Sequence, residues 1–138
     1  MFPASDWPLH LTVVPPFETT LAPDALSLSF PPAGPITARV GAPESFGARR
    51  TVPVLLIEPS AELTALHVAL MDALEAAGAR FGESRYVRAG YRPHVTVRDP
   101  ADAPRTGDLI ELSELALVDR APDGRRGLRR VVARIPLR

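Results

Sequence analysis

A histidine followed two residues later by a threonine, within an apolar run, occurs twice in this chain. The copies are His10-Leu11-Thr12 and His94-Val95-Thr96. In an extended strand successive side chains alternate between faces, so the histidine and threonine of each copy project from one side. The apolar residues beside them point to the other side, toward a core. The pattern predicts two strands, one from each half of the chain, that carry polar groups on one face.

The repetition of the pattern carries more weight than either copy alone. A single His-x-Thr carries little information, because any half-buried strand can hold such a pair on its solvent face. With only three histidines in the chain, two accidental copies would be roughly a one-in-a-hundred event. Around the second copy, Arg92 and Arg98 fall on the same strand face as His94. A proton-transfer group, a hydroxyl and two cations together match the chemical needs of a phosphate.

Composition limits the class of protein. A length of 138 residues fits one domain. The absence of cysteine excludes a disulfide framework, thiolate chemistry and cysteine-ligated zinc. No apolar stretch approaches the ~20 residues of a membrane span, so we expect a cytoplasmic enzyme. All basic residues are arginine and the net charge is zero, so any phosphate site must be a local cluster.

The elements indicated by the sequence give a mixed α+β domain. The strongest helix spans Ser60–Ala77, with Ser60 as the N-cap and Gly78 as the stop. A loop is expected over Gly41–Gly47. Strands are expected at Leu9–Val14, Ile36–Val40, Val52–Ile57, Glu111–Val118 and Leu128–Leu137, besides the second motif.

At these motifs the chain resembles the two-histidine (2H) phosphoesterases, which include bacterial 2′-5′ RNA ligases and RNA 2′,3′-cyclic phosphodiesterases. The flanks Val14-Pro15-Pro16-Phe17 and Arg92-Pro93 are similar to the usual flanks of that family. The resemblance implies a bilobal, pseudo-two-fold α+β fold with few helices, in which two antiparallel sheets form a central groove. It also implies one domain over residues 1–138, with a shortened N-terminal lobe because only Met1–Pro8 precedes the first motif.

The resemblance further implies a reaction and a set of site residues. The reaction is opening of a 2′,3′-cyclic phosphate on a nucleotide or RNA end, or formation of a 2′-5′ linkage, without metal or cofactor. We cast His94 as general base and His10 as general acid. The expected catalytic residues are His10, Thr12, His94 and Thr96, and the expected substrate-binding residues are Arg92, Arg98, Arg88, Trp7 and Phe17.

Other interpretations compete with this one. A module of the same fold could bind a nucleotide or RNA end without turnover, although both histidines are intact. A metal site would need a third ligand, and Asp6, Asp99 and Asp102 show no metalloenzyme spacing. The paired motifs could also be a coincidence in a packing domain. His67 lies at the edge of the apolar face of the predicted helix Ser60–Ala77 and has no companion threonine, so we leave it out of the site. We expect a monomer without membrane partners.

Overall fold

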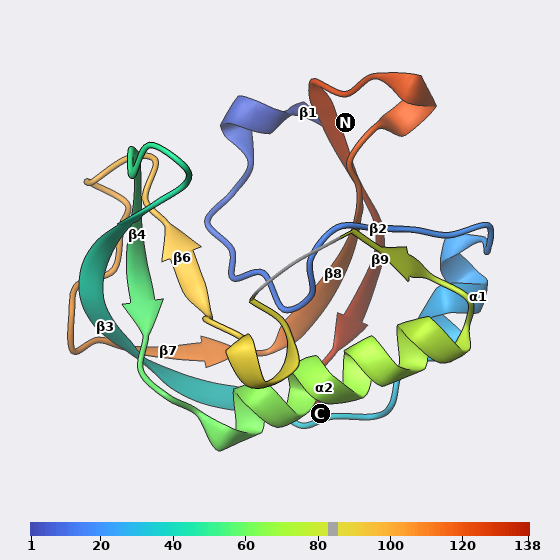
Figure 1. Ribbon diagram of the computed structural model, residues 1–138, viewed down its shortest axis with the longest axis horizontal. Coiled ribbons are helices and arrows are strands. Elements are labelled where there is room, and N and C mark those ends of the chain that lie inside the picture. The colour runs from blue at the N-terminus through green and yellow to red at the C-terminus, as the bar shows by residue number, and fades with distance from the viewer. Residues whose placement is uncertain (83–85) are drawn as a thin grey trace.

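The computed structural model of this protein describes residues 1–82 and 86–138. The strands are β1 (Phe2–Pro3), β2 (Phe17–Glu18), β3 (Ile36–Phe46), β4 (Val52–Ile57), β5 (Arg80–Phe81), β6 (His94–Thr96), β7 (Leu109–Leu112), β8 (Glu114–Asp119) and β9 (Leu128–Pro136). The helices are α1 (Pro23–Leu28) and α2 (Ala61–Ala76), and the 3-10 turns are η1 (Ala4–Asp6), η2 (Arg88–Gly90) and η3 (Pro122–Gly124). The fold is α+β, as predicted (Figure 1).

A four-stranded antiparallel sheet in the order β6-β4-β3-β7 holds the second motif. Helix α2 packs on one face of this sheet and lies along the bottom of the view in Figure 1. Leu63, Leu66 and Leu70 of α2 meet the buried side chains of the sheet, among them Val95 of β6. Burial of each such side chain contributes about 1.5–3 kcal/mol. This core therefore fixes the position of β6, on which the second motif lies.

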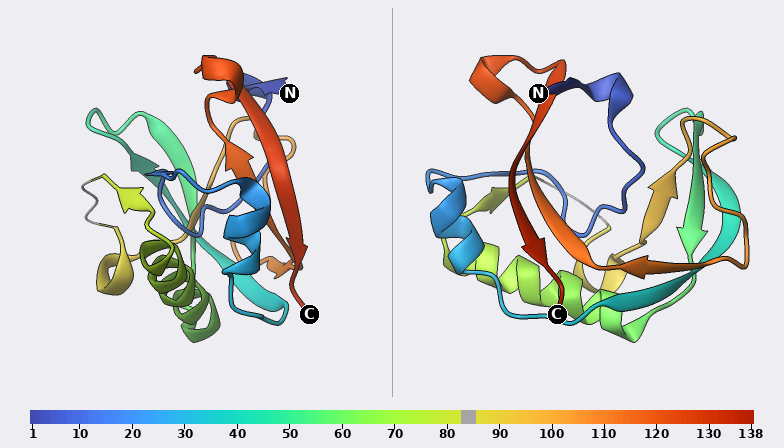
Figure 2. Two further views of the ribbon diagram at one scale, coloured as in Figure 1. Left: turned by 90° about the vertical axis from the view of Figure 1, so that its right-hand side faces the viewer. Right: turned by 180° about the vertical axis from the view of Figure 1, so that it is seen from behind.

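The second large sheet has the order β1-β9-β8, and one residue joins it to the first. β7 ends at Leu112 and β8 begins at Glu114, so the chain changes sheet at Ser113. The Leu137 N–H donates to the Ser113 carbonyl at 2.8 Å, which anchors the end of the chain at this joint. The two sheets diverge from that point into an open, curled half-barrel (Figure 2). A separate two-stranded pair, β2 and β5, lies near α1.

Several predicted elements are confirmed. Helix α2 occupies nearly the whole predicted range, and the Ser60 hydroxyl accepts a hydrogen bond from the Leu63 N–H. Gly78 takes φ +87° just after the helix, a conformation that favours glycine. Strand β4 has its predicted bounds. Within the described ranges, no helix is long and apolar enough to cross a membrane.

Three predicted elements differ from the structure. The expected strand Leu9–Val14 is not regular: within it only Leu11 forms a bridge, because the prolines before and after it limit the ladder. The expected loop Gly41–Gly47 is wrong, since β3 continues to Phe46 after an irregularity in register between Val40 and Pro43. The single strand expected at Glu111–Val118 is broken at Ser113, where the chain changes sheet.

We expect the cap of α2 to be measurable. Ser60→Ala removes the side-chain acceptor for the Leu63 N–H and should lower the free energy of unfolding by ~1 kcal/mol. Ser60→Asp keeps an acceptor at that position and should remain close to the parent protein. Urea denaturation of the three proteins checks this. Equal losses in both variants would show that the hydrogen bond contributes little.

Candidate active site

The two motifs lie side by side, although the chain separates them by most of its length. Leu11 forms an antiparallel bridge with Val95, so the central residue of one motif pairs with the central residue of the other. Residues next to a bridged pair project from the face opposite to it. His94 and Thr96 of β6 therefore project from the face opposite to Val95, which is buried in the core, and the bridge brings His10 and Thr12 of the irregular first segment beside them. The sequence could predict each motif, but only the fold could bring them together.

Each motif histidine is fixed in the same way at its Nδ1 atom. The His10 Nδ1 lies 2.7 Å from the Pro8 carbonyl oxygen, and the His94 Nδ1 lies 2.9 Å from the Arg92 carbonyl oxygen. A carbonyl only accepts hydrogen bonds, so both Nδ1 atoms carry a hydrogen and donate it. In the neutral form of each ring the Nε2 atom then holds the lone pair. Both imidazoles are thus oriented to exchange a proton through Nε2.

Each of these imidazoles also rests on an aromatic ring. The Trp7 indole stacks on His10 with 4.1 Å between centroids and 19° between planes. The Phe46 ring meets His94 at 4.7 Å and 65°, edge to face. An arginine lies over each aromatic ring: Arg129 is 5.3 Å from the Trp7 centroid and Arg92 is 5.0 Å from that of Phe46. These contacts restrict the rotation of both imidazoles.

The surroundings of His10 lower its pKa from the ordinary value of 6.5. The main cause is burial, which disfavours the charged imidazolium. The hydrogen bond to the Pro8 carbonyl acts in the opposite direction. The charges of Arg98 and His94 lower the pKa further, which also shows that both groups lie near the ring. Neutral His10 is therefore favoured near pH 7.

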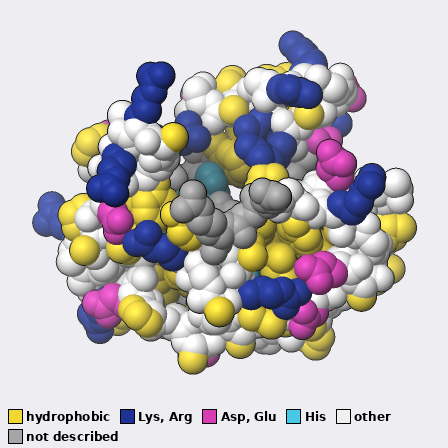
Figure 3. Space-filling model, viewed as in Figure 1, with side chains coloured by type: hydrophobic (Ala, Val, Ile, Leu, Met, Phe, Trp, Pro, Cys, Tyr) yellow, Lys and Arg dark blue, Asp and Glu magenta, His cyan; other side chains and the backbone are white. Residues whose placement is uncertain are grey.

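Polar groups suited to an oxyanion accompany the histidines. Thr12 is exposed and Thr96 is half-buried. Within the described residues, no hydrogen bond occupies either threonine hydroxyl, so both can donate to a bound group. The Arg98 guanidinium makes one long contact of 3.4 Å with the Ser5 carbonyl and forms no ion pair with any described residue. Figure 3 shows a histidine at the floor of a hollow with blue arginine side chains around it.

Two of the predicted cations have their charge engaged elsewhere. The Arg92 guanidinium pairs with Glu44 at 3.0 Å while lying over Phe46. The Arg88 guanidinium pairs with Asp72 and Glu75 of α2, at 2.9 and 3.0 Å. The structure therefore directs Arg88 toward the helix, whereas the charge of Arg98 acts on His10 and lowers its pKa.

The two predicted aromatic residues lie in different places. Trp7 contacts both His10 and Arg129, so its ring supports the histidine. Phe17 pairs with Phe81 across β2 and β5, with 5.5 Å between ring centroids, and packs against a second core cluster away from the motifs. Phe17 thus has no described contact with either histidine.

Phe46 is a site residue that the sequence did not indicate. It ends β3, in a segment where a loop was expected, and it lies far from His94 in sequence. Arg129 of β9 lies over the Trp7 ring, which in turn stacks on His10. Its Nη1 atom donates to the carbonyls of Arg120, Arg126 and Leu128. The alternation of buried and exposed residues ends at Val40, and Pro43 follows it, so the sequence carried no signal that extends β3 to Phe46.

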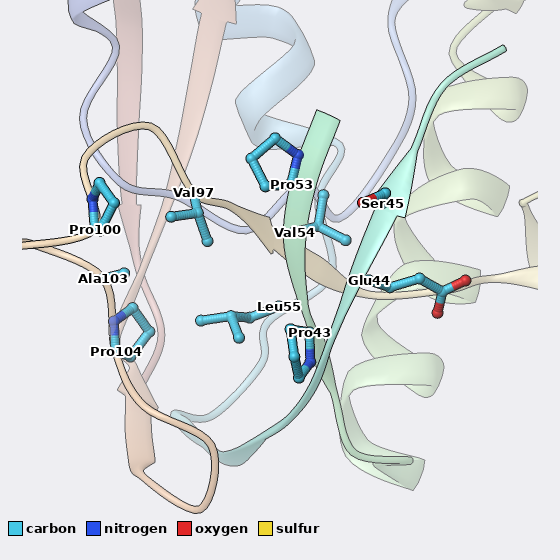
Figure 4. Close-up of a pocket in the computed structure, with 10 residues that line it drawn as sticks. All are labelled: Pro43, Glu44, Ser45, Pro53, Val54, Leu55, Val97, Pro100, Ala103 and Pro104. Atoms are coloured by element: carbon cyan, nitrogen blue, oxygen red, sulfur yellow. The ribbon is translucent and has the colours of Figure 1, made fainter. Parts of the chain in front are cut away.

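A separate hollow of about 450 Å³ lies where β3 and β4 meet the loop after β6 (Figure 4). Val54, Leu55 and Val97 are among the residues that line it. Neither motif histidine lines this hollow. In the described part of the chain, no three histidine or carboxylate side chains gather as a ready set of metal ligands.

Comparison with known proteins agrees with this geometry. The family model described as the 2′-5′ RNA ligase superfamily matches residues 3–123, which contain both motifs. This chain belongs to the 2′-5′ RNA ligase superfamily. The match supports the wider 2H phosphoesterase grouping and the fold expected from it. No curated protein and no solved structure matches the chain.

The environment of His10 leads to a test by titration. We expect NMR titration of the His10 imidazole to give a pKa below 6.5. Arg98→Gln should raise the pKa of His10, because one nearby positive charge is lost. Arg134→Gln is the matched control, since its exposed guanidinium pairs with Glu114, and should leave that pKa unchanged. The pKa of His10 is lower in the folded protein than in the unfolded chain. The contribution of neutral His10 to the free energy of unfolding is therefore complete above about pH 6.5, and it is lost as the pH falls through the pKa of the folded protein. A His10 pKa at or above 6.5 would contradict this account.

Proposed function

We propose that this chain is a metal-independent phosphodiesterase that opens 2′,3′-cyclic phosphates on nucleotides or RNA ends, or acts on 2′-5′ linkages. The observation that carries the proposal is the bridge between Leu11 and Val95, which sets two imidazoles with oriented Nε2 atoms on one face. Membership of the superfamily gives the class of chemistry. The rival is a module that binds the same ends without turnover.

The proposed step needs one base and one acid. One neutral imidazole takes a proton from water through Nε2, and the water oxygen attacks the cyclic phosphorus. As the new P–O bond forms, the bond from phosphorus to the 3′ oxygen breaks. The other imidazole, protonated, gives its Nε2 proton to that leaving oxygen. The product carries a 3′ hydroxyl and a 2′-phosphate, and the two histidines end with their protonation states exchanged.

The lowered pKa of His10 bears on which histidine plays which role. Because burial and nearby positive charge favour neutral His10, we assign it as the general base and His94 as the general acid. This assignment of acid and base is the reverse of the one expected from the sequence, in which no feature distinguished the roles of the two histidines. In the 2′-5′ ligation direction, the same groups exchange roles.

The remaining groups stabilise charge on the phosphate. Thr12 and Thr96 can donate to its non-bridging oxygens, where negative charge is held through the transition state. Arg98 supplies the positive charge, since Arg92 and Arg88 are paired with carboxylates. With few unpaired cations among the described residues near the histidines, and zero net charge, the site suits a short substrate or a strand terminus better than a long folded RNA.

We expect each histidine to be essential for turnover. His10→Ala and His94→Ala should each lower kcat at least ~10²-fold on a 2′,3′-cyclic mononucleotide, the usual contribution of a general acid or base. Thr96→Val removes a hydroxyl from a side chain of similar size and should have a smaller effect. Activity should persist in excess EDTA. Loss on chelation with recovery on adding a divalent ion would favour a metal site, and tight binding without turnover would favour the binding module.

We expect Arg98 and Arg134 to differ sharply in their effect on kcat/KM. Arg98→Gln removes a charge-assisted hydrogen bond to phosphate, worth ~1.5–3 kcal/mol, so kcat/KM should fall by roughly 10- to 100-fold. Arg134→Gln changes an exposed guanidinium that is paired with Glu114 and should alter kcat/KM less than ~2-fold. Steady-state kinetics on the same cyclic mononucleotide compares the two. Equal losses would show that Arg98 has no special role at the phosphate.

A further inference from the structure

The third histidine, His67 of α2, is completely buried and joins the segments that carry the two motifs. Its Nδ1 lies 2.6 Å from the carbonyl oxygen of Val13, the residue after the first motif. Its Nε2 accepts the backbone N–H of Arg88 at 2.7 Å, six residues before His94. The carbonyl only accepts and the N–H only donates, so His67 must be neutral with its hydrogen on Nδ1. Both ends of the ring are thus used to hold backbone.

Tyr91 adds a second link between the same segments. Its ring stacks on that of His67 with 4.1 Å between centroids and 5° between planes. Its hydroxyl donates to the Thr12 carbonyl at 2.8 Å. Burial raises the pKa of Tyr91 above its ordinary value, so the phenol keeps its hydrogen and remains a donor. Two consecutive carbonyls of the first motif segment, those of Thr12 and Val13, are therefore held by groups outside it.

The backbone at Arg88 needs this support. Arg88 has φ +54°, in the left-handed region that a residue with a side chain rarely adopts. The N–H bond to His67 fixes its backbone, and the ion pairs with Asp72 and Glu75 fix its side chain. All three partners lie on α2, so the helix sets where the chain enters the second motif.

We propose that His67 and Tyr91 are positioning residues that set the distance between the two motifs. The first motif needs such support because, within residues 1–82 and 86–138, the Leu11–Val95 bridge is its only ladder contact with the sheet. The pair acts through backbone groups and touches no reacting atom. The effect of this positioning on catalysis rests on the proposed function. A displacement of ~1 Å at a proton-transfer group can cost up to 10²-fold in rate.

The sharpest test is Tyr91→Phe, which keeps the ring on His67 and removes only the hydrogen bond to Thr12. We expect a folded protein whose kcat on a 2′,3′-cyclic mononucleotide falls roughly 5- to 20-fold with KM changed less than ~2-fold. The control is Leu74→Ala, a buried residue of the same helix in the other core cluster. It should lose stability and keep its kcat under conditions where it is folded. A kcat for Tyr91→Phe equal to that of the parent protein would overturn the proposal.

Variants of His67 separate positioning from packing. His67→Leu fills the space without a donor or acceptor, whereas His67→Gln keeps an amide that can donate and accept. We expect the glutamine variant to recover part of the kcat lost in the leucine variant, by ~3-fold or more, at matched fraction folded. Equal kcat in the two variants would assign His67 to packing alone.

A measurement without substrate distinguishes failure of this proposal from failure of the proposed function. The imidazole NMR signals of His10 and His94 should move in Tyr91→Phe and stay in place in Leu74→Ala. If the parent protein turns over no cyclic phosphate, moved signals still support the positioning role while the proposed reaction fails. Unmoved signals in Tyr91→Phe overturn the positioning role, whatever the activity.

Discussion

The backbone bridge between Leu11 and Val95 is the contact on which the candidate site depends. On the side of the second motif the support is extensive, because β6 pairs with β4 and the Val95 side chain lies in the core above α2. On the side of the first motif there is no regular strand, and prolines limit further pairing. The first motif is therefore held by apolar contacts of Leu11 and Val13 with the core and by polar contacts from His67 and Tyr91.

The two histidines have matching support and different environments. Each donates Nδ1–H to a carbonyl two residues earlier, rests on an aromatic ring, and has an arginine over that ring. A proline lies within the two residues before each histidine, and proline restricts the residue ahead of it to extended backbone. The rings nevertheless meet their aromatic partners differently, face to face at His10 and edge to face at His94. The two histidines thus share similar hydrogen bonds and aromatic contacts but have unequal surroundings, which supports the proposed division into one acid and one base.

Several arginines of this neutral protein are paired with carboxylates, whereas Arg98 is paired with none in the described part of the chain. Arg39, Arg88, Arg92, Arg130 and Arg134 each pair with a carboxylate. Such exposed pairs contribute little to stability, but they offset the charge of these five arginines. Among the described residues near the histidines, Arg98 keeps its charge without an ion pair and lowers the pKa of His10. An uncompensated positive charge therefore lies beside the candidate site.

The sequence by itself determined the repeated motif, the α+β class, the capped helix and the strand Val52–Ile57, because each follows from local spacing or from a capping residue. Tertiary structure decided the rest. Phe46 reaches His94 only because β3 continues past its irregularity, and Arg88 turns toward acidic side chains of α2. His67 looked like an ordinary helix residue, since its two backbone partners come from segments far away in the chain. Local patterns specify which side of a strand or helix a residue occupies, whereas the identity of its partners depends on long-range packing that one sequence does not display.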